Sequence, residues 1–150
     1  MAALPRGLKN KNPGNIIKGG NPYQGEVIPS QDSRFRQFKT IQYGYRALFH
    51  LLATYITKYQ WNTIEKIISH WAPSNENNTQ KYIVDVVKWS GIPEQSILAA
   101  TDYAKLTKIA YAISLKENGI VPSETEIKEG LTLLLNSLKS SDTDDDKKKI

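Results

Sequence analysis

The sequence of 150 residues contains no cysteine, one methionine and only two histidines. Without cysteine, a disulfide framework and a thiolate metal site are both excluded. The two histidines, His50 and His70, are too few to indicate a histidine-based metal site. We therefore expect a protein that works without a metal or another cofactor.

Long hydrophobic runs are also missing. No apolar stretch approaches the roughly 20 residues that a membrane-spanning helix needs. Residues 1–15 lack the apolar centre of a cleaved signal peptide. We expect a protein without a membrane span that is synthesised in the cytoplasm and that leaves it, if at all, without a cleaved signal.

Basic residues are in excess but are not concentrated in one element. The net charge is +5, and Arg34 and Arg36 form one of the two tightest basic pairs outside the C-terminal tail. This excess suits an anionic partner such as nucleic acid, anionic lipid or a bacterial wall. Specific nucleic-acid binding needs a coherent basic face, which the scattered pattern argues against.

The remaining composition is that of an ordinary globular protein, and the length fits one domain. Apolar spacing and capping signals predict helices over 40–59, 62–71, 78–90, 101–118 and 123–138. Turn signals divide residues 1–39, with a small hairpin predicted from 26–28 and 35–38. The fold class is therefore mostly α (α+β), with a small irregular or β lobe near the N-terminus. A single domain is expected over 1–139, followed by a disordered charged tail over 140–150.

Two tryptophans fall on predicted apolar stripes. Trp71 ends the stripe of the helix over 62–71, and Trp89 lies on the stripe of the next helix. We predict both to be core residues, because aromatic residues at helical spacing are usually buried.

The helix predicted before Gly119 carries the main candidate for chemistry. Its apolar stripe continues to Glu117, which lies four residues after Ile113. Unpaired carbonyls of the last turn and partial burial would both raise the pKa of this carboxyl group. A carboxylic acid that keeps its proton is what a glycosidase uses as general acid. Alternatively, Glu117 is an ordinary solvated residue beside Lys116.

Motifs for other chemistries are missing, since the sequence has no phosphate loop, nucleophile elbow or zinc-binding HExxH pattern. Carboxyl, amide and aromatic side chains remain, which are the groups that bind and cleave polysaccharides. The acids in informative positions are Glu26, Asp32, Glu76 and Glu117.

A series of short motifs carries a family resemblance. In chain order these are RGLKNKNPGNI over 6–16, YQG over 23–25, RF at 34–35 with Phe38, YGYRAL over 43–48, WAP over 71–73, EN at 76–77 with Thr79 and Tyr82, and ENG over 117–119. The series resembles phage and prophage virion structural proteins, which are similar to lysozyme-like peptidoglycan-degrading domains. The sequence departs from the family at Lys116, where histidine is typical, and at Tyr23, where tryptophan is usual.

The resemblance implies a site and a partner. The catalytic candidates are Glu117 and, as second choice, Glu76; the candidates for substrate binding are Asn15, Tyr23, Tyr43, Asn77, Tyr82 and Asn118. The implied partner is peptidoglycan or another glycan, together with virion or envelope proteins, and the implied location is the virion or the cell envelope. We expect the chain to be a monomer.

A second resemblance concerns the order of the elements. Residues 12–16, followed by Phe35, Phe38 and Gly44, look like a segment of bacterial glucosaminidases. In those enzymes the helix that ends in the catalytic glutamate precedes this segment, whereas here Glu117 follows it. A circularly permuted lysozyme-like domain would reconcile the two orders.

Two classes of function therefore remain. The first is a peptidoglycan glycosidase or lytic transglycosylase, with Asp32 or Glu26 as candidate second carboxylate. The second is a non-enzymatic virion or envelope module that keeps the lysozyme-like fold for glycan or protein binding. A cleft setting of Glu117 favours the enzyme, and a surface salt bridge favours the module.

Overall fold

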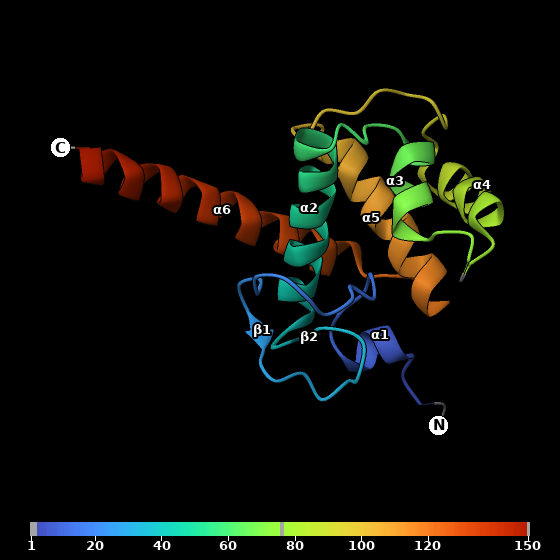
Figure 1. Cartoon of the computed structure of the whole chain (residues 1–150), viewed down its shortest axis with the longest axis horizontal. Helices are drawn as coiled ribbons and strands as arrows, with labels where there is room; N and C mark the ends of the chain where they lie inside the picture. Colours follow the sequence, from blue (N-terminus) through green and yellow to red (C-terminus); the bar gives the residue numbers. More distant parts are fainter. Residues whose placement is uncertain (1–2, 76, 150) are drawn as a thin grey trace.

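The computed structural model describes residues 3–75 and 77–149. Six helices and two short strands follow in the order α1 (Arg6–Lys9), β1 (Glu26–Val27), β2 (Gln37–Phe38), α2 (Ile41–Lys58), α3 (Ile64–Trp71), α4 (Thr79–Ser90), α5 (Tyr103–Asn118) and α6 (Glu124–Lys149). Figure 1 shows the N-terminal segment folded below the helices, against the lower ends of α2 and α5. The predicted class, mostly helical with a small β element near the N-terminus, is confirmed.

The N-terminal lobe is held by backbone pairing and one buried amide. Strands β1 and β2 are antiparallel, with Glu26 opposite Phe38, which confirms the predicted hairpin. The fully buried Asn12 side chain donates to the carbonyls of Ile16 and Arg36 at 3.0 and 2.9 Å and accepts from the Ile16 amide at 2.9 Å. One side chain thus joins the Asn12–Asn15 turn to the residue that precedes β2. The short helix α1 had no signal in the sequence.

Helices α2 and α5 form the centre of the core. Thr40 caps α2 as predicted, accepting from the Tyr43 amide. The predicted α5 stripe is fully buried, and its members are Leu106, Ile109, Ala110 and Ile113. The hydroxyl groups of Tyr45 and Ser114 lie 3.0 Å apart and link the two helices. A Cβ at Gly44 would collide with the Lys11 carbonyl oxygen, so glycine lets α2 pack directly on the N-terminal lobe.

Two helix starts differ from the predicted ones by one residue. Thr63, not Asn62, caps α3 by accepting from the Lys66 amide. The Asn62 carbonyl accepts from the Leu98 amide instead, which fixes this residue outside the helix. Helix α5 begins after Asp102 and not after Thr101, and the Asp102 carboxylate accepts from the Ala99 amide. Both cases reflect contacts with the loop over 91–102.

The prediction that Trp89 is a core residue is wrong. Its side chain is 37% exposed, whereas Val86 and Ser90 on the same helix are buried. Helix α4 is rotated so that Val86 and Ser90, four residues apart, face inward and Trp89 lies at the edge of the stripe. Trp71 is half-buried and packs against both hydrophobic clusters of the protein.

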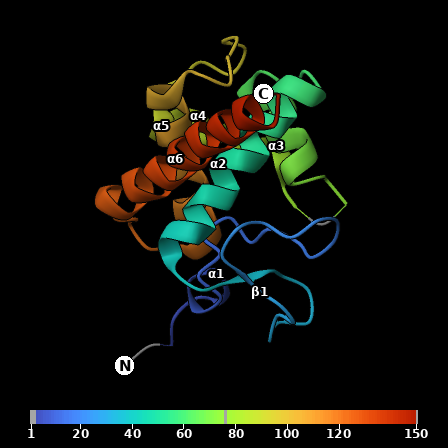
Figure 2. The ribbon, with the colours of Figure 1, turned by 90° about the vertical axis from the view of Figure 1, so that its left-hand side faces the viewer.

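Helix α6 is longer than predicted. It begins after Ser123, whose hydroxyl accepts from the Glu126 amide as expected, but continues past Leu138 to Lys149. The backbone is therefore helical over 140–149, where the sequence predicted disorder. Asp144 and Asp145 precede Lys148 and Lys149 by four residues, a spacing that favours an exposed helix. Figure 1 shows this end of α6 extending away from the other helices, and Figure 2 shows α6 crossing α2.

Candidate active site

A cleft of about 550 Å³ lies between the N-terminal lobe and the ends of α3 and α5. The lobe contributes residues from 14–23 and 34–36, and the helical side contributes residues of α2, the end of α3 and the loop after it. The cleft is lined by Gly14, Asn15, Ile16, Ile17, Gly19, Tyr23, Arg34, Phe35, Arg36, Leu51, Tyr55, His70, Trp71, Ala72, Pro73, Asn77 and Glu117. Its volume is in the range of small-ligand sites.

Glu117 lies in this cleft with both carboxylate oxygens held. Oε1 accepts from Asn15 Nδ2 at 2.8 Å, and Oε2 accepts from the Tyr82 hydroxyl at 2.7 Å. The neighbouring Lys116 turns away and pairs with Asp85 at 2.7 Å. The carboxyl group is half-buried and is fixed by neutral donors from two distant parts of the chain.

The Tyr82 hydroxyl group is a donor to Glu117. Its side chain is buried below the cleft, and burial, followed by the nearby charge of Glu117, raises the pKa of its hydroxyl well above the usual value. The phenol therefore keeps its proton at physiological pH and can donate to Oε2.

The Asn12–Asn15 turn places Asn15 against the end of α5. Asn15 has a left-handed backbone conformation, with φ of 52°. The side-chain Nδ2 of Asn118, one residue after Glu117, donates to the Pro13 carbonyl at 2.9 Å and so ties this turn to the helix end. A Cβ on Gly14 would lie 2.9 Å from the Trp71 ring, which explains why the turn needs glycine there.

The predicted substrate-binding residues take three different positions. Asn15, Tyr23 and Asn77 line the cleft, and Tyr82 lies behind Glu117. Asn118 is buried and holds the Asn12–Asn15 turn, and Tyr43 packs against Gly25 in the cluster of the N-terminal lobe, so neither is among the lining residues. Glu76, the second catalytic candidate, is outside the residues that the structure describes.

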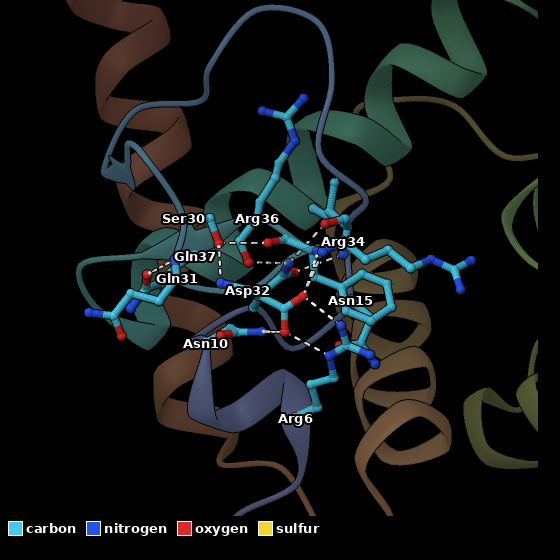
Figure 3. A network of polar contacts seen from close by, with 12 residues as sticks. Arg6, Asn10, Asn15, Ser30, Gln31, Asp32, Arg34, Arg36 and Gln37 are labelled. Atoms are coloured by element: carbon cyan, nitrogen blue, oxygen red, sulfur yellow. Dashed lines mark hydrogen bonds and ion pairs between the residues drawn. The ribbon is translucent and has the colours of Figure 1, made fainter.

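Asp32, the first candidate second carboxylate, is bound within the protein. It accepts two bonds of 2.7 Å from Arg6 and one of 3.0 Å from Asn10, with further bonds from the Arg34 and Phe35 amides. Figure 3 shows the carboxylate surrounded by these donors. The Arg6 hydrogen bonds are the main reason that the pKa of Asp32 lies well below its usual range.

Glu26, the other candidate for the second carboxylate, is also held in an ion pair within the protein. Its Oε1 lies 2.5 Å from Arg36 Nη1, and both side chains are almost fully buried. Arg36 also donates to the carbonyls of Ile17 and Gly19. Glu117 is therefore the only acid among the described residues that line the cleft.

Several residues that line the cleft were not among the predicted site residues, although Phe35 and Trp71 belong to the motifs of the family resemblance. Tyr55, His70 and Trp71 lie on helix stripes or next to them, and Phe35 and Arg36 belong to the predicted hairpin. Local periodicity says which face of a helix is apolar but not which helix ends meet. The Pro73 stop signal at the end of α3 was the one hint that this end lies near a loop.

Other features of the described residues, 3–75 and 77–149, give no second candidate for chemistry. Within them, no group of three or more His, Cys, Asp or Glu side chains is arranged to hold a metal ion, and no helix is long and apolar enough to cross a membrane. A second cavity of about 570 Å³ lies where α4, α5 and α6 meet, and Trp89, Tyr111 and Glu124 are in its lining.

Comparison with known proteins identifies the family. No family model matches the sequence. Protein P5 of Pseudoalteromonas phage PM2 is 41% identical over 129 residues, an alignment that covers 83% of this chain and 79% of the phage protein. The chain thus belongs to the family of the phage PM2 protein P5.

Proposed function

We propose that this protein cleaves the glycan strands of peptidoglycan, as a glycosidase or lytic transglycosylase, with Glu117 as general acid. The observation that carries the proposal is the position of Glu117 as the sole described acid of a substrate-sized cleft, held by Asn15 and Tyr82. A phage relative supports a role at the bacterial envelope, with the protein carried in the virion or delivered to the wall.

In the proposed reaction the protonated Glu117 donates its proton to the glycosidic oxygen while the bond from that oxygen to the sugar C1 breaks. Asn15 and Tyr82 keep the carboxyl group in one orientation. Donation requires one of the two oxygens to exchange its protein hydrogen bond for one to the substrate. The half-exposed setting of Glu117 at the cleft allows this exchange.

The fate of C1 depends on a second group. Asp32 and Glu26 are engaged with arginines, and neither lines the cleft. We therefore favour transglycosylation, in which a hydroxyl of the same sugar attacks C1 and returns its proton to the Glu117 carboxylate. Hydrolysis would instead add water at C1, activated by the same carboxylate.

The fold that we propose is a circularly permuted lysozyme-like domain. In it the Asn12–Asn15 turn precedes, along the chain, the helix that ends at Glu117.

The test is digestion of purified bacterial wall sacculi by the wild-type chain and by Glu117→Gln. The variant should fold normally and lose cleavage by at least the roughly 10²–10⁴-fold typical of general acid catalysis. Glu129→Gln, which changes an exposed glutamate of α6, is the matched control and should cleave as the wild type does. Mass analysis of the products distinguishes hydrolysis from transglycosylation by one water.

Full activity of Glu117→Gln would remove this residue from the mechanism. A wild-type chain that binds sacculi without cleaving them would identify it as the alternative, a non-enzymatic module of the virion or envelope.

A further inference from the structure

Beside the cleft, three aromatic rings form a stack that the catalytic proposal does not use. Trp61 is stacked on His70 with 3.5 Å between ring centroids and 5° between planes, and on Tyr59 with 4.6 Å and 19°. The Tyr55 ring contacts Trp61 edge-on at 5.0 Å. We call Tyr59, Trp61 and His70 the aromatic platform.

A bend of the backbone at Gln60 brings the rings of the aromatic platform together. Gln60, between the two aromatic residues, has a left-handed conformation with φ of 58°, which is uncommon for a residue other than glycine. The bend lets the side chains at 59 and 61 face each other, and the Trp61 amide donates to the Tyr55 carbonyl at 3.0 Å. Side chains two residues apart do not meet in a regular helix, so the bend is what creates the stack.

The aromatic platform is open to solvent, unlike a stack of aromatic rings in the core. Tyr59 is 47% exposed and His70 is exposed, while Trp61 between them is half-buried. Exposed aromatic rings next to a cleft are typical of binding surfaces. His70 is at once a member of the platform and a lining residue of the Glu117 cleft, so the two surfaces are continuous.

The hydrogen bonding of His70 adds a polar group at this junction. Its Nδ1 lies 2.7 Å from the Lys66 carbonyl oxygen, which can only accept, so Nδ1 carries the hydrogen. In the neutral ring Nε2 is then an acceptor for a hydroxyl or amide group. Lys58 lies 5.4 Å from the Tyr59 ring centre and gives the outer end of the platform a positive charge.

From these observations we infer that the aromatic platform is a binding site for an N-acetylated glycan strand, which continues from the Glu117 cleft across His70 to Tyr59. Trp61 covers one face of Tyr59 and one face of His70, so the apolar C–H face of a sugar would pack on the opposite faces of these two rings. The hydroxyl and acetamido groups of the sugar suit the His70 Nε2. The positive charge of Lys58 suits the carboxylates of peptide stems on a peptidoglycan strand. The inference rests on the proposed function for the identity of the glycan.

The test measures binding, so that it does not depend on cleavage. The full chain carrying Glu117→Gln is titrated by calorimetry with short and with long N-acetylglucosamine oligomers. We expect the long oligomer to bind more tightly, because only it reaches from the cleft to Tyr59. Adding Tyr59→Ala or His70→Ala should weaken binding of the long oligomer by roughly three- to tenfold. The Tyr59 change should leave the short oligomer unaffected.

Two controls separate stacking from other effects. Tyr59→Phe keeps the ring and should bind as the parent does, and Trp89→Ala removes an exposed tryptophan that does not line the cleft and should have no effect. Circular dichroism establishes that each variant is folded. Equal affinity of the parent for both oligomers, no binding of either, or unchanged affinity in Tyr59→Ala would overturn the platform. Cleavage of sacculi by the wild type would still stand as a separate result.

Discussion

At the scale of single residues, the N-terminal lobe is held together by charged side chains, such as Asp32, that take no part in the proposed reaction. Asp32 is surrounded by donors from α1 and from the turn before β2. The same contacts that exclude it as a second carboxylate hold the segment whose residues Arg34, Phe35 and Arg36 line the cleft. Asp32 therefore supports the site by shaping its wall.

We predict that Asp32→Asn lowers the melting temperature by a few degrees at neutral pH, because the amide group cannot accept from all of these donors. The pKa of Asp32 is lowered in the folded protein, so its contribution is present above the unfolded pKa of about 3.9 and is lost as pH falls through the lower folded value. The difference in melting temperature between the two proteins should therefore begin to shrink as the pH falls below about 4 and keep shrinking in stronger acid. A difference that widens in acid would contradict this assignment.

At the scale of helices and strands, the sequence predicted a helix end correctly where the capping residue lies within one turn of that end. The caps Thr40, Asn78 and Ser123 and the left-handed Gly91 and Gly119 follow from residues within one turn of each helix end. Where a distant segment decides, as at Thr63 and Asp102, the predicted boundary was displaced by one residue.

The candidate site also combines residues that the sequence indicated with residues that only the folded structure brings together. The helical stripe before Gly119 selected Glu117, the family resemblance supported it and added Asn15 and Tyr82, and the structure joins the three residues by two hydrogen bonds. Periodicity could not find His70 or Trp61, since their contact depends on how the loop after α2 folds back on α3. Trp89 was misassigned because an apolar residue at the edge of a stripe has the same spacing signal as one at its centre.

We predict that replacing Trp71 by alanine destabilises the protein more than replacing Trp89 does. Trp71 contacts both hydrophobic clusters and the Gly14 turn, so Trp71→Ala should lower the free energy of unfolding by about 2–3 kcal/mol, less than for a fully buried ring. Trp89→Ala, at a site that is 37% exposed, should cost less than about 1 kcal/mol. Urea unfolding followed by circular dichroism measures both. Equal losses would show that α4 buries Trp89 after all.

At the scale of the whole molecule, α6 has two parts with different surroundings. Its first part packs on α2: Ile127 and Leu134 are buried, a Cβ at Gly130 would lie 2.5 Å from Tyr45 Cβ, and Arg46 donates to the Ser137 hydroxyl at 2.9 Å. The part after Lys139 extends away from the other helices in Figure 1. The contacts of the first part anchor α6 to the domain that we predict over 1–139.

We predict that residues 140–150 are dispensable for stability and for wall cleavage. The segment is helical over 140–149. Its sequence has no apolar stripe that would anchor it, and an unanchored helix of this length is marginal in water, because its few turns gain too little to offset chain entropy. It carries four aspartates and three lysines and no apolar residue except the last, so its removal changes the net charge by only one. A chain that stops at Lys139 should therefore unfold within about 0.5 kcal/mol of the full chain and digest sacculi at the same rate. A large fall in melting temperature would show that the segment packs on the domain. Loss of cleavage with unchanged melting would instead place it in substrate or partner binding.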